Sequence, residues 1–137
     1  MATTAELTDR EYRALADFRH ALRVFQHFSE DAARAEGLAP NQHQLLLAVR
    51  GFDGEGAPTI SDVAERLQLQ HHSTVELVGR AVRAGLLRRA PDAADKRRQR
   101  LSLTAKGERR LSALAVVHRD ELRRFRDEMA DVLRELG

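Results

Sequence analysis

The chain contains no cysteine among its 137 residues. Disulfides, cysteine-based zinc sites and redox sensing through a thiol are therefore excluded. Long apolar runs are also missing, since none approaches the roughly 18 residues that a membrane-spanning helix requires. The first residues, MATTAELTDREYRALADF, are acidic and lack the basic and apolar regions of a secretory signal peptide. These absences predict a soluble cytoplasmic protein with no membrane partner.

Signatures of catalysis and metal binding are equally scarce. His118-Arg119-Asp120 matches a kinase triplet by letters only, because it lies in a predicted helix without a glycine-rich loop. The six histidines include no His-x₃-His pair, although His20 and His27 lie seven residues apart on one predicted helix face. We therefore predict no enzymatic activity, no cofactor and no metal site.

Charge is distributed unevenly along the chain, although the formal net charge is only +2. Residues 80–110 hold 11 Lys or Arg and three acidic residues, a net charge of +8, which leaves 12 basic and 18 acidic residues elsewhere. Such a concentrated basic segment is typical of a surface that meets nucleic-acid phosphates. An ordinary solvated surface with salt bridges is the alternative interpretation.

Apolar periodicity predicts a mainly α-helical chain with long helices at both ends. Residues 8–36 show apolar steps of three and four, and residues 105–137 continue them as a heptad pattern. The heptad positions are Leu111, Ala115, His118, Leu122, Phe125, Met129, Val132 and Leu136.

Little other chain is left to cover these long helices, so we predict that they meet the same helices of a second copy. The alternative is that the two helices pack on each other within one monomer. The residues predicted to form the dimer interface are Leu15, Phe18, Leu22, Leu122, Phe125, Met129, Val132 and Leu136.

The middle of the chain predicts three shorter helices. One begins at Pro40, and a glycine-rich loop over 51–58 follows it. Ser61 is predicted to cap a helix over 62–69, and a tight turn leads to a helix over 72–84 that Gly85 ends. Two short helices joined by a tight turn are a helix-turn-helix. Thr59 and Ile60 are candidates for a small additional strand.

A basic β-hairpin follows the helix-turn-helix. Leu86-Leu87 and Leu101-Ser102-Leu103 flank a turn marked by Pro and Asp, and the turn region carries Lys96, Arg97, Arg98 and Arg100. The predicted fold class is thus mainly α with a small β-hairpin wing, a winged helix-turn-helix with terminal dimerisation helices. This plan predicts binding of double-stranded DNA, with the second helix in the major groove and the wing along the backbone or minor groove.

These residues resemble the MarR family of transcriptional regulators. The family pattern of Gly-Leu-Val/Leu, then Asp-x-Arg, then Leu-Thr-x-x-Gly matches Gly85-Leu86-Leu87, Asp95-Lys96-Arg97 and Leu103-Thr104-Ala105-Lys106-Gly107. The resemblance implies one MarR-like domain over 1–137, with dimerisation helices over 8–36 and 105–137 and a DNA-binding lobe over 40–104. It also implies a homodimer on a pseudo-palindromic operator, acting most often as a repressor that a small ligand or signal releases.

On the predicted recognition helix, the first exposed residues are expected to reach base edges. Glu76 is suited to cytosine N4, and Arg80 to guanine O6 and N7. The alternatives are a Glu76–Arg80 pair on a solvated face, and a capping or phosphate-binding role for a hydroxyl of the first turn. The candidates are His71, His72, Ser73, Thr74, Glu76 and Arg80.

In the wing, the resemblance implies that Arg97 lies at or near the minor groove, whose negative potential attracts Arg. Asp95 is then expected to orient an arginine, because phosphates would repel its carboxylate. Lys96, Arg98 and Arg100 are expected to add positioning charge, although side chains in a hairpin alternate faces and at least one of the four is expected to point into solvent.

Two other interpretations remain open. The first is a zinc-sensing variant, because some MarR relatives sense zinc through His and acidic ligands. The other is a helical interaction protein whose basic hairpin docks an acidic protein partner. The effector of a regulator is unknown from these residues; Phe18, Phe25 and Phe28 are either its pocket or, by the usual burial of aromatics, core.

Overall fold

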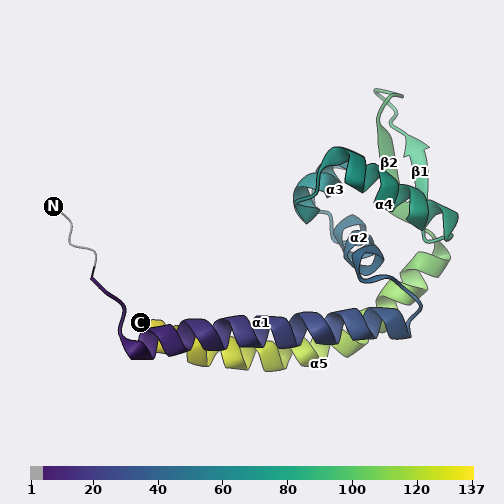
Figure 1. The fold of residues 1–137 in the computed structure, drawn as a ribbon. Helices are drawn as coiled ribbons and strands as arrows, with labels where there is room; N and C mark the ends of the chain where they lie inside the picture. The colour runs from purple at the N-terminus through teal and green to yellow at the C-terminus, as the bar shows by residue number, and fades with distance from the viewer. Residues whose placement is uncertain (1–4) are drawn as a thin grey trace. The chain divides into compact units, whose positions relative to one another are not determined.

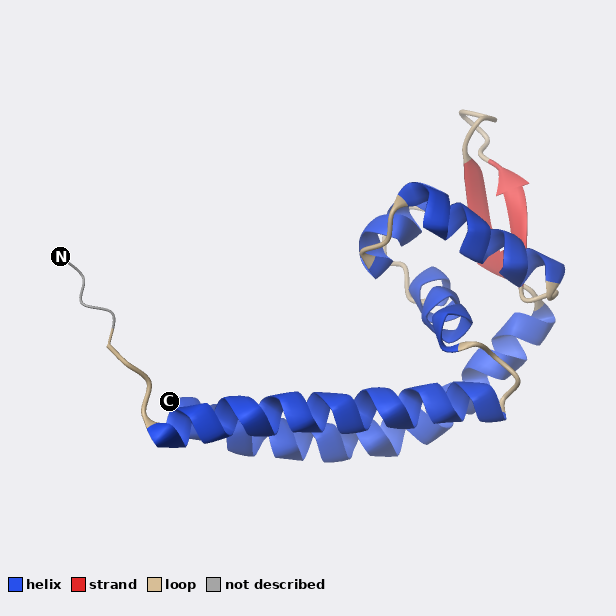
Figure 2. Cartoon of the chain, viewed as in Figure 1, coloured by secondary structure: helices blue, strands red, loops and turns tan. Residues whose placement is uncertain are grey.

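The structure, a computed structural model, describes residues 5–137. It confirms a mainly α-helical chain with one antiparallel hairpin (Figures 1 and 2). The elements are α1 (Asp9–Ala35), α2 (Pro40–Arg50), α3 (Ile60–Leu67), α4 (His71–Arg83), β1 (Leu87–Pro91), β2 (Gln99–Leu103) and α5 (Ala105–Leu136).

The chain divides into two compact units. The helix-pair unit comprises α1 as far as Ala32 and α5 from Val116, and the hairpin unit runs from Ala33 to Ala115. The hairpin unit therefore includes the first part of α5, where Leu111 and Leu114 are buried. Two of the predicted heptad positions, 111 and 115, thus belong to the unit that carries the hairpin rather than to the helix pair.

In the helix-pair unit, α1 and α5 run antiparallel and side by side (Figure 1). The ring of Phe25 lies 5.2 Å from that of Phe125 and 6.3 Å from that of His118, centroid to centroid. The His118 Nε2 lies 2.8 Å from the Ser29 Oγ, so the buried imidazole has a polar partner within the same chain. Phe28 also packs against His118, with ring centroids 5.5 Å apart, which favours the core interpretation of these aromatics.

The predicted interface residues therefore do not form one uniform seam. Phe125 contacts α1 of its own chain, and Val132 is buried. At these two positions the structure agrees with the alternative prediction, in which the two long helices pack on each other within one chain. Leu15 and Leu122 instead remain 40% and 50% exposed. Phe18, Leu22, Met129 and Leu136 are half-buried.

The hairpin unit buries a core of aliphatic side chains from every one of its elements. Its fully buried residues include Leu45 and Leu46 of α2, and α2 contacts α3, α4 and β2. The hairpin register pairs Leu87 with Leu103 across the two strands, and both side chains are buried. The wing, here the residues from Leu87 to Leu103, is thus anchored at its base by apolar packing.

The start of α3 differs from the prediction. Thr59, and not Ser61, is the N-cap: its hydroxyl accepts from the Asp62 N–H at 3.2 Å, and the Asp62 carboxylate accepts from the Thr59 N–H at 2.9 Å. This reciprocal pair satisfies two helix-end donors. Thr59 also forms a bridge with Arg100 of β2, so the predicted extra strand exists at Thr59 alone, while Ile60 already begins α3.

The turn between α3 and α4 is built without glycine. Gln68 takes the left-handed conformation, at φ 56°, that glycine usually supplies, and its side chain donates to the Glu65 carbonyl at 2.7 Å. Gly85 follows the end of α4, as predicted; it is left-handed at φ 76°, and the Leu86 N–H bonds the Ala81 carbonyl at 2.9 Å. The chain then passes directly into β1 beside α4.

Candidate nucleic-acid interface

The outer surface of α4 carries most of the predicted recognition residues. His71, His72, Glu76 and Arg80 are exposed, and Ser73 is half-buried. Among residues 5–137, Glu76 and Arg80 take part in no side-chain hydrogen bond or ion pair, so the predicted alternative of an i, i+4 pair is not formed. Both charged groups are available to a partner.

Thr74 does not belong to this surface. It is completely buried, and its hydroxyl donates to the Gln70 carbonyl at 3.0 Å, one turn back along the helix. The prediction that Thr74 is an exposed base-reading candidate is therefore wrong. The physical reason is helical phase: Thr74 lies on the same face as the buried Leu77, Val78 and Ala81.

Val75 occupies an exposed position that the sequence reasoning missed. It is 39% exposed and lies three and four residues after His72 and His71, which puts it next to them on the helix. This spacing from the two histidines could have indicated from the sequence that Val75 lies on the exposed face. An apolar side chain at such a position is able to contact the methyl group of thymine.

The N-terminus of α4 has no side-chain cap. Gln70 is the N-cap residue and makes no side-chain capping bond, so neither Ser73 nor Thr74 caps the helix. Backbone N–H groups of the first turn lack partners within a helix and suit anionic groups such as phosphate. The exposed side chains of His71 and His72 and the uncapped backbone N–H groups therefore lie at the same end of α4.

At the wing tip, Arg97 is paired with Asp95. The Arg97 Nε lies 3.2 Å from the Asp95 Oδ1, and the Arg97 backbone N–H bonds the same oxygen at 3.1 Å. The hydrogen bond from the Arg97 side chain is the main reason that the pKa of Asp95 is lowered. The contact expected of Asp95 is present, and it leaves the Arg97 side chain 91% exposed.

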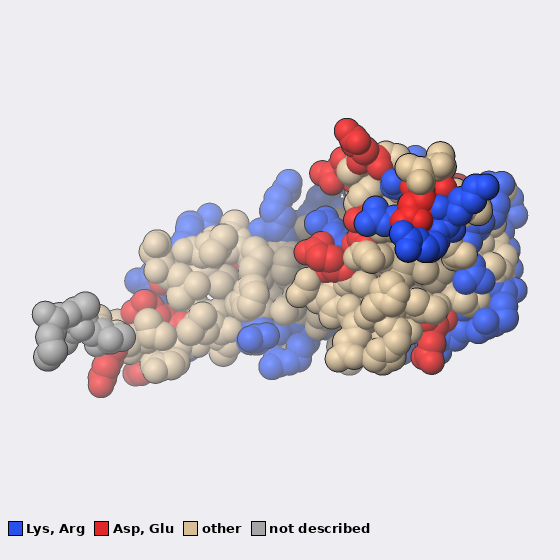
Figure 3. Space-filling view, turned by 90° about the horizontal axis from the view of Figure 1, so that it is seen from above, with Lys and Arg blue, Asp and Glu red and all other residues tan. Residues whose placement is uncertain are grey.

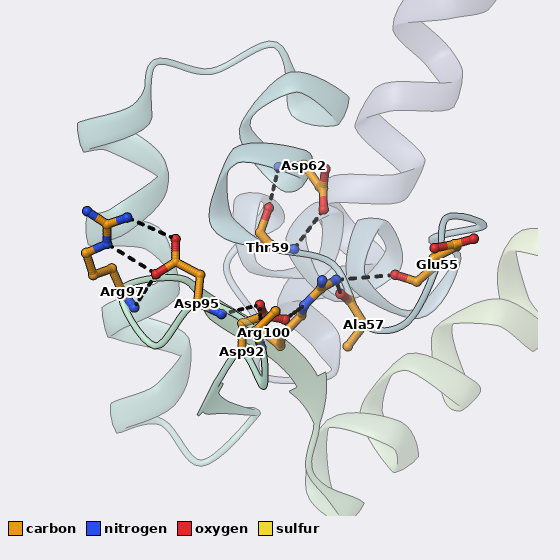
Figure 4. A network of polar contacts seen from close by, with 9 residues as sticks. Glu55, Ala57, Thr59, Asp62, Asp92, Asp95, Arg97 and Arg100 are labelled. Atoms are coloured by element: carbon orange, nitrogen blue, oxygen red, sulfur yellow. Dashed lines mark hydrogen bonds and ion pairs between the residues drawn. The ribbon is translucent and has the colours of Figure 1, made fainter.

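Arg100 was expected to add positive charge for DNA binding, but its side chain is directed toward the protein. Its Nε donates to the Asp92 Oδ1 at 2.8 Å, and its Nη1 donates to the Ala57 carbonyl at 2.6 Å and to the Glu55 carbonyl at 3.2 Å (Figure 4). The hydrogen bond from Arg100 is also the main cause of a lowered pKa at Asp92. The guanidinium therefore faces the protein, and Asp92, which the sequence marked only as part of a turn, is its partner.

Other basic side chains surround this tip. Lys96 and Arg98 are exposed, and so are both Arg88 and Arg89 of β1. Lys and Arg gather over the part of the molecule that carries the hairpin in Figure 3. An exposed basic surface beside an exposed helix face is the arrangement that phosphate binding requires.

No comparable arrangement exists for a metal. Across residues 5–137, no group of three or more His, Asp and Glu side chains is placed to hold an ion. The helix-pair unit has an open groove of about 710 Å³ that includes His20, but basic and acidic residues line it together, among them Arg13, Asp17 and Arg134. None of the helices in the described part of the chain is long and apolar enough to cross a membrane.

Comparisons with known proteins agree with this geometry. A model of the MarR family matches residues 36–98. AbsC, a MarR family transcriptional regulator from Streptomyces coelicolor, is similar with a TM-score of 0.74 and 26% identity, over 89% of this chain and 82% of that one. The S. aureus MepR–DNA complex gives a TM-score of 0.70 and 20% identity, over 90% and 85%.

A transcriptional regulator of M. tuberculosis, MosR, was solved in complex with DNA and is similar with a TM-score of 0.60 and 25% identity, over 83% of this chain and 88% of that one. No curated protein matches the chain in sequence.

A helix-turn-helix that runs directly into a two-stranded hairpin defines a winged helix-turn-helix protein. The family match spans this helix-turn-helix and most of the wing, and the structural likenesses cover the terminal helices as well. The chain is thus similar to MarR family transcriptional regulators, as its motifs predicted: the family model matches residues 36–98, and the similar solved structures include MarR family regulators.

Proposed function

We propose that the chain, as a single MarR-like domain, binds double-stranded DNA with α4 in the major groove and the wing along the backbone or minor groove. The observation that carries the proposal is the combination of unpaired Glu76 and Arg80 on the exposed face of α4 with an exposed Arg97 on the neighbouring hairpin. The similar MepR and MosR structures contain DNA, which supports the same role here.

In this proposal the exposed residues of α4 read base edges. His71, His72, Ser73, Glu76 and Arg80 remain candidates, while the burial of Thr74 removes it. Glu76 accepts from cytosine N4, and Arg80 donates to guanine O6 and N7. The operator half-site is thus expected to contain both bases.

The wing supplies contacts that depend less on sequence. Arg97, held by Asp95, enters the minor groove, and Lys96 and Arg98 contact phosphates. Asp95 itself stays with Arg97, because a carboxylate near phosphates is repelled. Arg100 does not contact DNA in this proposal, because its guanidinium bonds Asp92 and two carbonyl groups of the protein.

We propose that the protein works as a homodimer held by α1 and α5, because pseudo-palindromic half-sites require two readers. Leu15, Leu122 and Leu133 are exposed by 40%, 50% and 63%, and these large apolar side chains supply surface for a second copy. The half-buried Phe18, Leu22, Met129 and Leu136 extend that surface, while Phe125 and Val132 serve mainly to hold α1 and α5 together.

The family resemblance supports a repressor that a small ligand or signal releases from DNA. The second candidate function is docking of an acidic protein partner on the basic wing. Selection from a random library of duplexes distinguishes the two. Enrichment of a two-fold symmetric sequence, with half-site centres about 10 base pairs apart, supports the regulator. Failure to enrich any symmetric sequence contradicts it.

A further inference from the structure

Three oxygen atoms from two other segments converge on the guanidinium of Arg100. One belongs to the carboxylate of Asp92 in the wing, and two are carbonyl oxygens of the loop between α2 and α3, at Glu55 and Ala57 (Figure 4). The side chains of Arg100 and Asp92 are 31% and 13% exposed, so most of this ion pair is removed from solvent. Only arginine offers several donors in one plane for such a set of acceptors.

The loop is shaped to present these two carbonyls. Gly56, which stands between them, is left-handed at φ 70°, a conformation that glycine adopts without cost. A Cβ on Gly56 would lie 3.7 Å from the Arg100 Nη1, so the backbone passes close to the guanidinium. One turn of the loop thus brings the carbonyls of Glu55 and Ala57 to the same nitrogen.

The Asp92 carboxylate, which binds Arg100, also accepts hydrogen bonds from the wing tip. The Asp92 Oδ2 accepts from the backbone N–H groups of Asp95 at 2.9 Å and of Ala94 at 3.2 Å. Asp95 then holds Arg97 through its own side chain. Hydrogen bonds therefore run without interruption from the loop, through Arg100, Asp92 and Asp95, to the exposed Arg97.

We infer that Arg100 is a positioning residue for DNA binding: it ties the wing to the loop between α2 and α3 and so determines where Arg97 is presented. The inference rests on the proposed DNA-binding function. A two-stranded hairpin is only marginally stable alone, so a wing of this size needs attachment to hold its tip in one place. The Thr59–Arg100 bridge and the hydrogen bond from the Leu101 N–H to the Pro58 carbonyl, at 2.9 Å, add to the same attachment.

Positioning and direct phosphate contact make opposite predictions for three substitutions. Arg100→Lys keeps the charge but cannot reach the three acceptors together, so positioning predicts a loss and phosphate contact predicts retention. Asp92→Asn removes a negative charge near DNA, so electrostatics alone predicts tighter binding, whereas loss of the ion pair predicts weaker binding. Arg100→Ala lowers the salt dependence only if Arg100 contacts a phosphate.

The experiment titrates these three variants and the wild type against the selected operator at several salt concentrations. We expect each variant to weaken binding by about tenfold, the effect of losing a hydrogen bond to a charged group, with the wild-type salt slope retained. Glu55→Gln is the matched control for Asp92→Asn, because it removes one negative charge and leaves the Glu55 carbonyl in place. The control should bind as well as the wild type or slightly better.

In addition, the losses from Arg100→Ala and Arg97→Ala should be less than additive in the double variant, since Arg100 acts by positioning Arg97, whose charge stays near the DNA when Arg100 alone is replaced. Wild-type affinity for Arg100→Lys together with a lower salt slope for Arg100→Ala would overturn the inference. So would tighter binding by Asp92→Asn.

A measurement without DNA separates this inference from the proposed function. Backbone ¹⁵N relaxation of residues 93–97 reports the order of the wing tip on the ps–ns timescale. We expect this order to fall in Arg100→Lys and Asp92→Asn and to stay at the wild-type level in Glu55→Gln. If the wild type selects no operator, the DNA-binding proposal fails while the relaxation data still test the attachment. Unchanged tip order in both variants overturns the attachment itself.

Discussion

A Cβ placed on Gly107 would lie 2.2 Å from the carbonyl oxygen of Leu86. That carbonyl also accepts the Thr104 N–H at 3.0 Å. The Thr104 hydroxyl donates to the Gly85 carbonyl at 2.5 Å and accepts the Gly107 N–H at 3.1 Å. The start of α5 is therefore attached to the junction of α4 and β1, and the Leu-Thr-x-x-Gly motif has a steric reason for its glycine.

Gly107→Ala should destabilise the protein by about 1–3 kcal/mol, as overpacking in a well-packed region does, because the obstructing atom belongs to the backbone. Chemical denaturation of both proteins measures the difference. Gly54→Ala is a matched control: its Cβ would lie 2.4 Å from the ring of Phe52, but that is the far end of a side chain that is able to rotate. An equal loss in both variants would contradict the argument.

Features specified by neighbouring residues were predictable from the sequence. The left-handed Gly85 after α4, the start of α2 at Pro40 and the hairpin between two apolar pairs all depend on residues within a few positions. The family motifs lie between Gly85 and Gly107, in and beside the hairpin. Local pattern was therefore enough for the fold class and for the position of the wing.

Features that depend on distant partners were not predictable. Thr59 and Ser61 are both good N-caps, and the choice follows from the bridge that Thr59 makes with Arg100. Arg100 looked like one more wing charge because its carbonyl partners lie 43 and 45 residues away. The heptad of α5 marked an apolar face but not which part of it α1 of the same chain covers.

Leu122→Glu and Leu133→Glu should each convert the proposed dimer into a monomer. A buried unpaired carboxylate in an interface costs several kcal/mol, whereas at an exposed position it costs little. Sedimentation at micromolar concentration measures the state. These residues are cleaner probes than Phe125, which also packs on Phe25 within one chain.

Val116→Glu is the control for this prediction, because Val116 is 60% exposed on a different face of α5. A wild type that sediments as a monomer contradicts the dimer. A dimer that survives both leucine substitutions shows that other surfaces hold it.

The wing tip should loosen only in acid. Hydrogen bonds from Arg100 and Arg97 hold the pKa of Asp92 and of Asp95 below the ordinary value. Because the folded pKa is depressed, this stabilisation is fully present above the unfolded pKa of about 4 and is lost as pH falls through the folded value. NMR titration of the carboxyl carbons should give midpoints below the ordinary aspartate value for both residues, with the Asp92 midpoint returning upward in Arg100→Ala. An Asp92 midpoint that Arg100→Ala leaves unchanged contradicts the assignment.

Arg97→Ala should weaken DNA binding for many sequences alike, since phosphate and minor-groove contacts carry little base identity. The slope of log affinity against log salt should fall by about 0.9, the value of one contact. Titration at several salt concentrations measures both quantities. Arg23→Ala removes the same charge from an exposed position on α1 and is the control. No effect of Arg97→Ala at any salt would mean that the wing does not touch DNA.

Substitutions on α4 should instead change which bases are preferred. Glu76 and Arg80 are exposed and have no partner among residues 5–137, so each is free to bond one base edge. Glu76→Ala and Arg80→Ala should each lose about 1–3 kcal/mol of discrimination at one position in each half-site. The measurement is a titration of each variant against the selected operator and its single-base variants. Glu65→Ala is the control, because it removes an exposed acid from α3 and should leave base preference unchanged. If Arg80→Ala lowers affinity for every sequence equally, Arg80 contacts a phosphate, and the reading of guanine must be assigned to another residue of α4.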